Sequence, residues 1–567
     1  MSPFEICDKR KEILNSTGHL LIEGGPGCGK TTIALLKAKE IIDKGFLASN
    51  QKILFLSFAR ATISRVEEQA KGLISKDDKK NIEINTYHGF SWSIIQSFGY
   101  LLNSHRYFNL ITPPNLSAKL ANIPEAERDA FKKSLFNNNG IICFDLFSEI
   151  SSLVLEKAEK ICSIMSLSYP YIIVDEFQDT DTFEWKLIRL LGGKSKIIAL
   201  ADLDQRIYEF RGASITRIPE FNEHFKGKRI DFGKENYRSA NTDIVQFGDD
   251  LLTGKNKGKT YKDVIISRYP YYQDARLNLR YALLNSIQRL KKAKKSEKWS
   301  IAILVHSKLE TLSISSYLTA QNIFHEVLID PAGPTLSASI IAKMLEPHGD
   351  LEEDAQNLMT YIINHIKGRK GEKISQSDLK FALALEKYLE TGKISGSNRT
   401  DLITEIRVLL NKRKLLQYSG IPEDDWISIR KLFQDAKHDS LKNVFEDAKY
   451  LRLLNKGALL SEKLSEMWRL NQKYNNAGKA IEDALTQEHF SMTSRVFNGV
   501  FVMNIHKSKG KEFDEVIIWE EVYKQIVRPE STPKRIQQDR LLLRVAVTRA
   551  RERTTFLTPA NSPCILV

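Results

Sequence analysis

The chain has 567 residues, a formal net charge of +14 and a sequence pI near 9.2. This length is too great for one ordinary hydrophobic core and predicts three or four domains. With 42% hydrophobic and 27% charged residues the composition is globular, and no run of about 18 apolar residues indicates a membrane span. The positive charge favours a polyanionic partner, although many basic proteins bind no nucleic acid.

The N-terminus and the cysteines bear on the cellular compartment. The first residues, MSPFEICDKRKEIL, lack the apolar segment of a secretory signal, so we expect a cytoplasmic protein. Cysteines 7, 28, 143, 162 and 564 occur singly, without the paired spacing of a zinc site or the density of a disulfide scaffold. We therefore expect reduced thiols.

In the first 230 residues, short apolar runs alternate with amphipathic stretches. The apolar runs are HLLIE (19–23), KILFLS (52–57), YIIVDE (171–176) and KIIALAD (196–202), and the stretches TTIALLKAKEIID and FEWKLIRLL lie between them. This rhythm predicts a parallel α/β sheet. Polar, proline-bearing sequence from about 97 to 140 interrupts it and predicts a small insertion.

A second α/β pattern begins after residue 231 and is interrupted before it is complete. WSIAILVH, KLETLSISSYLTAQ and IFHEVL are followed, from about 336 to 485, by long, charged, helix-like sequence. Strand character returns at VFNGVFVMNI and EVIIWE, so the helical block is predicted to be an insertion. The basic cluster KKAKKSEK at 291–298 is interpreted as a solvated loop rather than a binding site.

A glycine-rich segment follows the first predicted strand and precedes a predicted helix. Residues 24–31, GGPGCGKT, match GxxxxGK[ST] in the context that gives this motif its meaning. Glycine backbone N–H groups can surround phosphates, Lys30 can place its charge against the β- and γ-phosphates, and the Thr31 hydroxyl can bind Mg²⁺. The predicted nucleotide contacts here are Gly24, Gly25, Pro26, Gly27, Cys28, Gly29, Lys30, Thr31 and Thr32.

Two adjacent carboxylates follow the strand YIIV. Asp175 is predicted to hold Mg²⁺, and Glu176 to orient and deprotonate an attacking water. An isolated acidic pair after a strand is commonplace, but its position downstream of a P-loop favours a nucleotide-hydrolysing site. Lys30, Asp175 and Glu176 are thus candidate catalytic residues, with Thr31 and Asp175 as metal ligands.

Further motifs occur in a characteristic order. DEFQDT is followed by ALADLDQRIYEFRGA and ENYRS; LSFARATISRVEEQ and NTYHGF precede it, and NIHKSKGKEFDEVII and RLLLRVAVTRARER follow. In these motifs the sequence strongly resembles the UvrD, Rep and PcrA group of superfamily 1 helicases. The resemblance covers nearly the whole chain and is weakest in the two insertions.

The resemblance implies an α/β fold with two RecA-like P-loop NTPase domains and ATP between them. Domain 1A would comprise residues 1–96 and 141–231, with a reduced 1B insertion at 97–140. Domain 2A would comprise 232–335 and 486–567, with a helical 2B insertion at 336–485.

The resemblance also assigns roles around the nucleotide. Gln178 and Gln205 would sense the γ-phosphate, and Arg238 and Arg549 would reach it from domain 2A. Such arginines neutralise charge in the transition state. Tyr237 would stack on the adenine, Glu512 would hydrogen-bond the ribose, and Gly510 would be a further nucleotide contact.

Loop aromatics would stack on the bases of a single strand, which tolerates any sequence. The predicted platforms are Phe58, Tyr87, His88, Phe90, Tyr208 and Phe210, and the predicted polar contacts are Arg60, Thr86 and His506. Phe58 and Phe90 are equally compatible with packing in the core.

Three positions depart from the family. Lys9 stands where relatives have a glutamine that reads adenine, so we expect either that the site accepts GTP as well as ATP or that another residue reads the base. Asn504 replaces the usual threonine, and Lys511 replaces an apolar residue before Glu512, which could alter coupling to the strand.

The leading hypothesis is an ATP- and Mg²⁺-dependent translocase or helicase on single-stranded DNA or single-strand/duplex junctions. The resemblance alone implies 3′ to 5′ polarity. The alternative is a nucleic-acid-sensing ATPase that regulates a partner nuclease with little unwinding, as in antiphage defence systems of the Gabija type. An RNA-directed motor is a third possibility.

Overall fold

The computed structural model describes two compact units. One contains Met1–Phe98, Ser148–Ile329 and Met492–Val567, and the other Gly99–Phe147 and Asp330–Ser491. Within these ranges the structure describes all residues except 1–5, 58–65, 68–69, 71, 203–213, 215, 234–238, 240, 271–273, 295–297, 329–331, 348, 372–373, 449–457, 491–497, 523–524 and 528–531.

The first sheet has six parallel strands in the order β3-β2-β6-β7-β1-β8. They are β1 (Leu20–Glu23), β2 (Ile53–Ser57), β3 (Ile82–Thr86), β6 (Tyr171–Val174), β7 (Lys196–Ala201) and β8 (Lys228–Asp231). Parallel strands require crossover connections, and the intervening helices supply them. These are α2 (Lys30–Asp43), α4 (Tyr87–Phe98), α7 (Phe147–Lys157), α8 (Glu159–Ser168), α9 (Thr182–Gly192) and α10 (Arg217–Phe225), and α1 (Asp8–Asn15) precedes the first strand.

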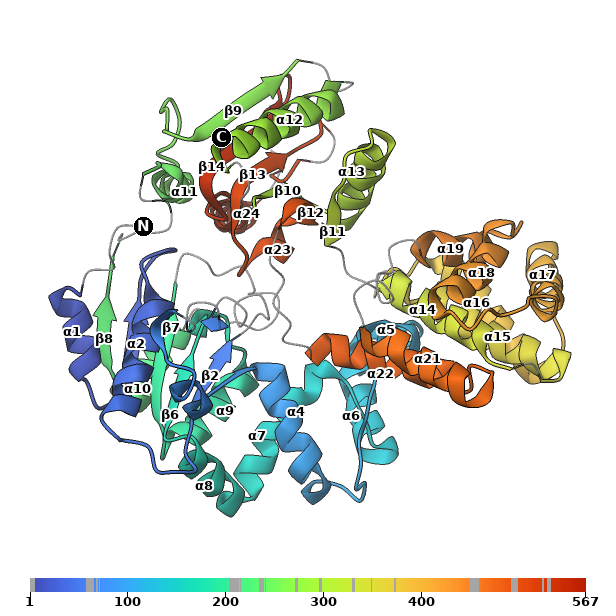
Figure 1. Cartoon of the computed structure of the whole chain (residues 1–567), viewed down its shortest axis with the longest axis horizontal. Coiled ribbons are helices and arrows are strands. Elements are labelled where there is room, and N and C mark those ends of the chain that lie inside the picture. Colours follow the sequence, from blue (N-terminus) through green and yellow to red (C-terminus); the bar gives the residue numbers. More distant parts are fainter. Residues whose placement is uncertain are drawn as a thin grey trace. The chain divides into compact units, whose positions relative to one another are not determined.

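The second sheet also has six parallel strands, in the order β11-β12-β10-β13-β14-β9. Its strands are β9 (Val264–Tyr269), β10 (Ser300–Val305), β11 (Glu326–Leu328), β12 (Gly499–Asn504), β13 (Phe513–Trp519) and β14 (Ala550–Pro559). Its helices are α11 (Ile244–Thr253), α12 (Ala275–Lys294), α13 (Lys308–Ala320), α23 (Ile505–Ser508) and α24 (Pro533–Val547). Figure 1 shows green and red strands side by side in this sheet, because the chain leaves it after β11 and returns at β12.

The central strand β10 is buried on both faces of the second sheet. Ala302 and Leu304 join a core with residues of α11 and α24, whereas Ile301, Ile303 and Val305 join a separate core with residues of α12 and α13. Side chains alternate across a strand, so both faces of β10 must be apolar. This explains the uninterrupted run SIAILV.

The second unit is mainly helical. Its helices are α5 (Pro113–Leu120), α6 (Arg128–Asn139), α14 (Ala332–Leu345), α15 (Leu351–Gly368), α16 (Gln376–Thr391), α17 (Ser397–Lys414), α18 (Pro422–Gln434), α19 (Asp439–Ala448), α21 (Ala458–Asn471) and α22 (Ala477–Phe490). Two short parallel strands, β4 (Asn109–Leu110) and β5 (Ile141–Ile142), complete it. Helix α14 is buried along almost its whole length and forms the centre of the core.

The apolar runs named from the sequence form strands, which confirms the predicted α/β class. Strands β3, β4, β5, β8, β9 and β14 were not predicted. The interpretation of 291–298 as a loop is wrong for its first four residues, which form the last turn of α12. No described helix is long and apolar enough to cross a membrane. The boundaries proposed for domains 1A, 1B, 2A and 2B remain predictions.

Candidate ATP site and nucleic-acid contacts

The P-loop connects β1 to α2 at the edge where the strands of the first sheet end. Gly24 donates its N–H to the carbonyl of Ala201 at 3.2 Å, which fixes the start of the loop beside β7. Gly27 and Gly29 have φ values of 79° and 91°, a left-handed conformation that favours glycine. A Cβ on Gly24 would lie 2.7 Å from the Cys28 sulfur. The loop therefore requires glycine for its curvature and for its close packing.

Lys30 is the first residue of α2, and its side chain folds back over the loop. Its Nζ donates to the carbonyl oxygens of Gly24 at 2.6 Å and Gly25 at 2.9 Å. It also lies 4.0 Å from Oδ2 of Asp202, which follows β7. The ammonium is thus held at the mouth of the loop, where it can neutralise phosphate charge.

The predicted acidic pair follows β6. Asp175 is buried and donates its backbone N–H to the carbonyl of Leu56 in β2 at 2.8 Å. Glu176 has φ 53°, which is uncommon for a residue with a side chain and occurs often at functional sites. The left-handed residue is the second of the two predicted carboxylates.

Neighbouring groups hold Glu176 in its ionised form. Gln178 Nε2 donates to Glu176 Oε2 at 2.6 Å. Burial opposes ionisation, but the nearby ammoniums of Lys509 and Lys30, together with this hydrogen bond, give Glu176 a pKa below its usual value. A carboxylate that remains ionised at neutral pH can accept a proton from water.

Lys509 and Asp179 form a buried ion pair beside Glu176. Lys509 lies just after α23, and its Nζ donates to Asp179 Oδ2 and lies 3.9 Å from Glu176 Oε2. Burial raises the pKa of Asp179 to about 7 in spite of the Lys509 ammonium, and the Glu176 carboxylate adds to the rise. The ion pair therefore connects the loop after β12, a strand of the second sheet, to the acidic turn after β6, a strand of the first sheet.

Two arginines of the last motif also approach this site. Arg544 on α24 is buried, donates from Nε to Asp249 at 3.0 Å and lies 3.9 Å from Oδ1 of Asp202. Arg549, a predicted catalytic residue, is buried, donates to the carbonyl of Val545 at 3.0 Å, and its charge acts on Glu176. Positive charge from this motif therefore reaches the acidic turn.

Other predicted nucleotide residues have defined partners. Gln178 accepts the N–H of Asp202 at 2.9 Å, so its amide bridges the turns after β6 and β7. Gly510 has φ 75°. The carboxylate of Glu512 accepts from Arg551 at 3.2 Å. Lys9 donates to the carbonyl of Asp231 at 2.6 Å.

The predicted strand contacts at the end of β3 differ in their exposure. Thr86 Oγ1 accepts the N–H of Gly89 at 2.9 Å, and His88 is half-buried. Tyr87 is 2% exposed and Phe90 1%, and the Phe90 ring packs edge-on against Tyr169. A base could stack on either ring only after its surroundings rearranged. The core alternative considered for Phe90 thus describes its position in this structure.

The remaining predicted contact near β12 is His506, which is half-buried on α23. Asn504, one of the departures from the family, caps this helix by accepting the N–H of Lys507 at 3.0 Å. Lys511, another departure, donates to the carbonyl of Lys507. Both departures are accommodated by hydrogen bonds within the loop. Seven predicted residues lie outside the described ranges: Phe58, Arg60, Gln205, Tyr208, Phe210, Tyr237 and Arg238.

The chemistry of the described residues fits a magnesium nucleotide. The left-handed glycines, the Lys30 ammonium and the start of α2 suit phosphates. Among the described residues, no group of three or more His, Cys, Asp and Glu forms a metal cage. Mg²⁺ in nucleotide sites is bound by one or two protein groups together with phosphate oxygens and water, and Thr31 and Asp175 would be these groups.

Sequence reasoning missed Asp179, Asp202, Lys509 and Arg544. Each stands within a motif that was recognised, only a few residues from a predicted site residue. One signal for these residues was present in the sequence: they are charged residues in motif loops to which no role had been assigned. Their burial, which gives these charges their importance, depends on the fold.

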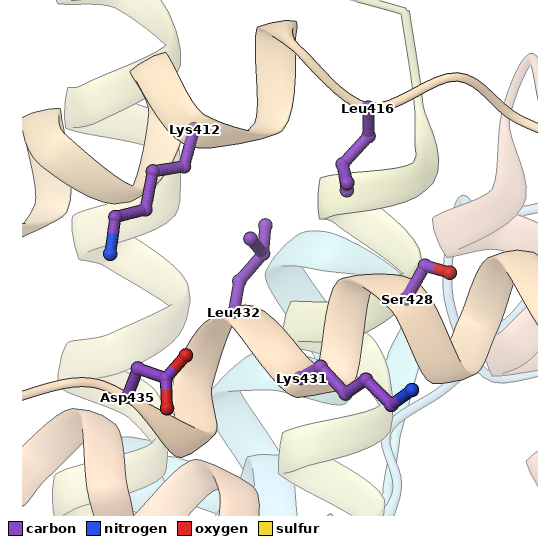
Figure 2. Close-up of a pocket in the computed structure, with 6 residues that line it drawn as sticks. All are labelled: Lys412, Leu416, Ser428, Lys431, Leu432 and Asp435. Atoms are coloured by element: carbon purple, nitrogen blue, oxygen red, sulfur yellow. The ribbon is translucent and has the colours of Figure 1, made fainter.

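A shallow pocket in the second unit lies between α17 and α18. Figure 2 shows its lining residues, Lys412, Leu416, Ser428, Lys431, Leu432 and Asp435. The Lys431 ammonium points away from the two leucines. None of the residues predicted from the sequence lies there.

Two all-parallel sheets, a P-loop and an acidic turn define a RecA-like ATP-hydrolysing protein. The UvrD/REP helicase N-terminal domain matches residues 7–154 and 138–226, and the UvrD-like helicase C-terminal domain matches residues 353–559. The chain belongs to the UvrD-like superfamily 1A helicases and is an ATP-dependent DNA helicase.

Named relatives agree with this assignment. A probable DNA helicase II homolog of Rickettsia conorii is 24% identical over 98% of this chain and 92% of its own length. The ATP-dependent DNA helicase PcrA of Staphylococcus aureus is 22% identical over 98% of this chain and 83% of its own. The crystal structure of Pif1 helicase from Candida albicans matches 50% of this chain and 55% of its own, at 13% identity and a TM-score of 0.25. That likeness is too low to support the fold, which follows from the strand order and the family domains.

Proposed function

We propose that this helicase moves 3′ to 5′ along single-stranded DNA, and that its Mg²⁺- and ATP-dependent cycle opens and closes the contacts between the two RecA-like sheets. The polarity rests on the family resemblance alone, and the observation that carries the proposed opening and closing is the cluster of Lys509, Asp179 and Glu176. In this cluster Lys509, which follows β12 and α23 of the second sheet, contacts the acidic turn after β6 of the first sheet. A change in that contact changes the surroundings of the hydrolytic carboxylate.

Each described residue has a definite task in this proposal. Bound MgATP supplies the γ-phosphate and the divalent charge. Lys30 neutralises phosphate charge, Thr31 and Asp175 hold the metal, and a Glu176 oxygen accepts a proton from water. Arg549 adds positive charge from the second sheet. Gln205, Arg238 and Tyr237 are proposed to act at the nucleotide as the family motifs imply.

The strand is proposed to bind at the motif loops. Thr86, His88 and His506 lie in motif loops that the structure describes. Tyr87 and Phe90 would have to move before a base could stack on them. Phe58, Arg60, Tyr208 and Phe210 complete the proposed contacts. The proposed domains are 1A (1–96, 141–231), 1B (97–140), 2A (232–335, 486–567) and 2B (336–485).

Strand displacement tests the proposal. Duplexes with 3′ or 5′ overhangs should be mixed with enzyme, ATP and Mg²⁺, with Lys30→Ala as the inactive control. Displacement from the 3′ overhang is expected, and displacement only from the 5′ overhang would refute the polarity. DNA-stimulated hydrolysis without displacement would favour an ATPase that regulates a partner nuclease.

The salt dependence of binding gives an independent check. Affinity for single strands should fall with salt at a log-log slope of about −0.7 per neutralised phosphate. A flat dependence would show that the +14 charge serves another partner.

A further inference from the structure

Helix α12 has two apolar stripes on different faces. Leu279, Leu283 and Leu290 are buried in the core against the second sheet. Leu277, Tyr281 and Leu284 are 39%, 59% and 40% exposed. Their spacing of four and three residues places them on one face of a helix. This second stripe, the outer stripe, is left uncovered by the described residues.

The charge of α12 is entirely positive. The helix contains the basic residues Arg276, Arg280, Arg289, Lys291, Lys292 and Lys294 and no acidic residue. Within the fold, Arg289 pairs with Glu515 and Glu552, and Lys294 pairs with Asp514 and Glu552. These contacts neutralise the basic groups that face the sheet.

The basic residues of α12 that point away from the sheet lack carboxylate partners of this kind among the described residues. Arg276 donates to Ser313 Oγ at 2.9 Å and lies 6.0 Å from the centre of the Tyr317 ring, and it forms no ion pair with a carboxylate in the described part of the chain. Lys291 and Lys292 are exposed and form no ion pair with any described residue. The outer stripe is therefore accompanied by unneutralised positive charge on the same helix.

We infer that the outer face of α12 is a docking surface for an acidic amphipathic helix of a partner protein. An amphipathic helix presents apolar residues at the same spacing of three and four that separates Leu277, Tyr281 and Leu284. Its acidic residues would complement Arg276, Lys291 and Lys292. Tyr281 is central and the most exposed of the three, and a central tyrosine often contributes much of the binding energy of an interface.

Two other occupants fit the surface less well. Nucleic acid would use the lysines, but the two leucines provide neither a phosphate donor nor a stacking platform. A membrane surface would require a broad apolar face, whereas the opposite stripe of α12 is already buried in its own domain. An acidic helix uses the apolar stripe and the positive charge together.

A designed peptide tests the surface directly. The probe is a fluorescein-labelled peptide of about 20 residues, mostly glutamate, with leucines at helical spacing; a scrambled peptide of equal composition is its control. Binding to the full chain is measured by fluorescence anisotropy at physiological salt. Two variants change the surface: Leu277→Ala/Tyr281→Ala/Leu284→Ala and Lys291→Glu/Lys292→Glu.

Matched control variants keep the test specific. Leu309→Ala removes a leucine that is 77% exposed on α13. Lys255→Glu/Lys257→Glu changes the charge by the same amount at exposed positions outside α12. Thermal unfolding verifies that every variant remains folded. Excess single-stranded oligothymidine should displace any peptide that binds at the DNA-strand site rather than at α12.

The expected result is selective loss of peptide binding. The helical peptide should bind at least about tenfold more tightly than the scrambled one, and each α12 variant should weaken it by about tenfold or more. The controls and the DNA-stimulated ATPase should not change. Equal binding of both peptides, or of wild type and α12 variants, would overturn the inference. So would displacement by oligothymidine, or a dimer in sedimentation that the triple variant abolishes, which would identify nucleic acid or a second copy as the occupant.

Discussion

Lys509 donates a buried hydrogen bond to Asp179, across 330 residues of sequence. The acceptor belongs to the turn after β6 that also contains Glu176, and the donor follows α23, which begins where β12 ends. The pair therefore links the second RecA-like sheet to the acidic turn of the first.

Replacing Lys509 by methionine should destabilise the protein strongly. The Asp179 carboxylate would remain buried without its ammonium partner, and breaking a buried pair in this way costs about 3–5 kcal/mol. The unfolding midpoint in calorimetry should fall, and the double variant Asp179→Asn/Lys509→Met should recover most of it. Lys507→Met, at an exposed position two residues earlier, is the control. Additive single effects in the double variant would show that the pair is not coupled.

Asp179→Asn should change how stability depends on pH. Because the folded pKa of Asp179, about 7, lies above its ordinary value of 3.8, the folded chain binds more protons between these values, and stability from this group falls as pH rises through that range. The variant lacks this titration. Its unfolding midpoint relative to wild type should therefore increase from pH 5 to pH 8. A constant difference would contradict the raised pKa.

Gly24→Ala should damage the P-loop by steric overlap. The added Cβ would lie 2.7 Å from Cys28 Sγ and 3.1 Å from Phe232 Cβ. Overpacking of this kind costs about 1–3 kcal/mol. Gly25→Ala is the stability control, since its Cβ would approach no atom closer than 3.9 Å. Combining Gly24→Ala with Cys28→Ala should restore part of the loss, and failure to do so would locate the strain elsewhere.

Glu176→Gln should abolish hydrolysis while sparing nucleotide binding. The amide keeps the size of the side chain but cannot accept the proton, a loss of about 10²- to 10⁴-fold in rate for a general base. A fluorescent ATP analogue should still bind, whereas Lys30→Ala should lose binding as well. Glu159→Gln, on the exposed surface of α8, is the control. Wild-type turnover by Glu176→Gln would remove this residue from the mechanism.

Lys9→Gln should increase the preference for ATP over GTP. The family resemblance predicts that position 9 reads adenine, and the Lys9 ammonium cannot supply the paired donor and acceptor of an amide. One or two hydrogen bonds of about 1 kcal/mol each correspond to roughly a tenfold gain in discrimination. The ratio of kcat/KM for the two nucleotides measures it. An unchanged ratio would show that another residue reads the base.

The P-loop, the acidic pair and the apolar strands could be predicted because their signals are local. Gly24 to Thr31 are adjacent in sequence, and β1, β2, β6 and β7 are continuous apolar runs. Strands β8 and β9 were missed because they are edge strands with exposed positions, so their composition is mixed.

The ion pair of Lys509 with Asp179 and the burial of Tyr87 could not be predicted from local signals. Both depend on which distant segments pack together, and a tyrosine in a motif loop has the same sequence whether it is buried or exposed. The position of Lys291 was misjudged for another reason: a run of lysines is typical of loops, but here it ends a helix whose other face is in the core.

The strand order of the second sheet has a consequence for how this chain is made. Strand β10 lies between β12 and β13, which the ribosome synthesises only after the whole helical segment from α14 to α22. Until then both edges of β10 are unpaired and the face that packs against α24 is only partly covered, and transiently unpaired apolar strands aggregate readily. During this time the helical segment must therefore fold on its own or be shielded, because the second sheet remains incomplete until its C-terminal strands are made. Completion of this sheet should be a late, slow step in biosynthesis, as expected for pairings between distant segments.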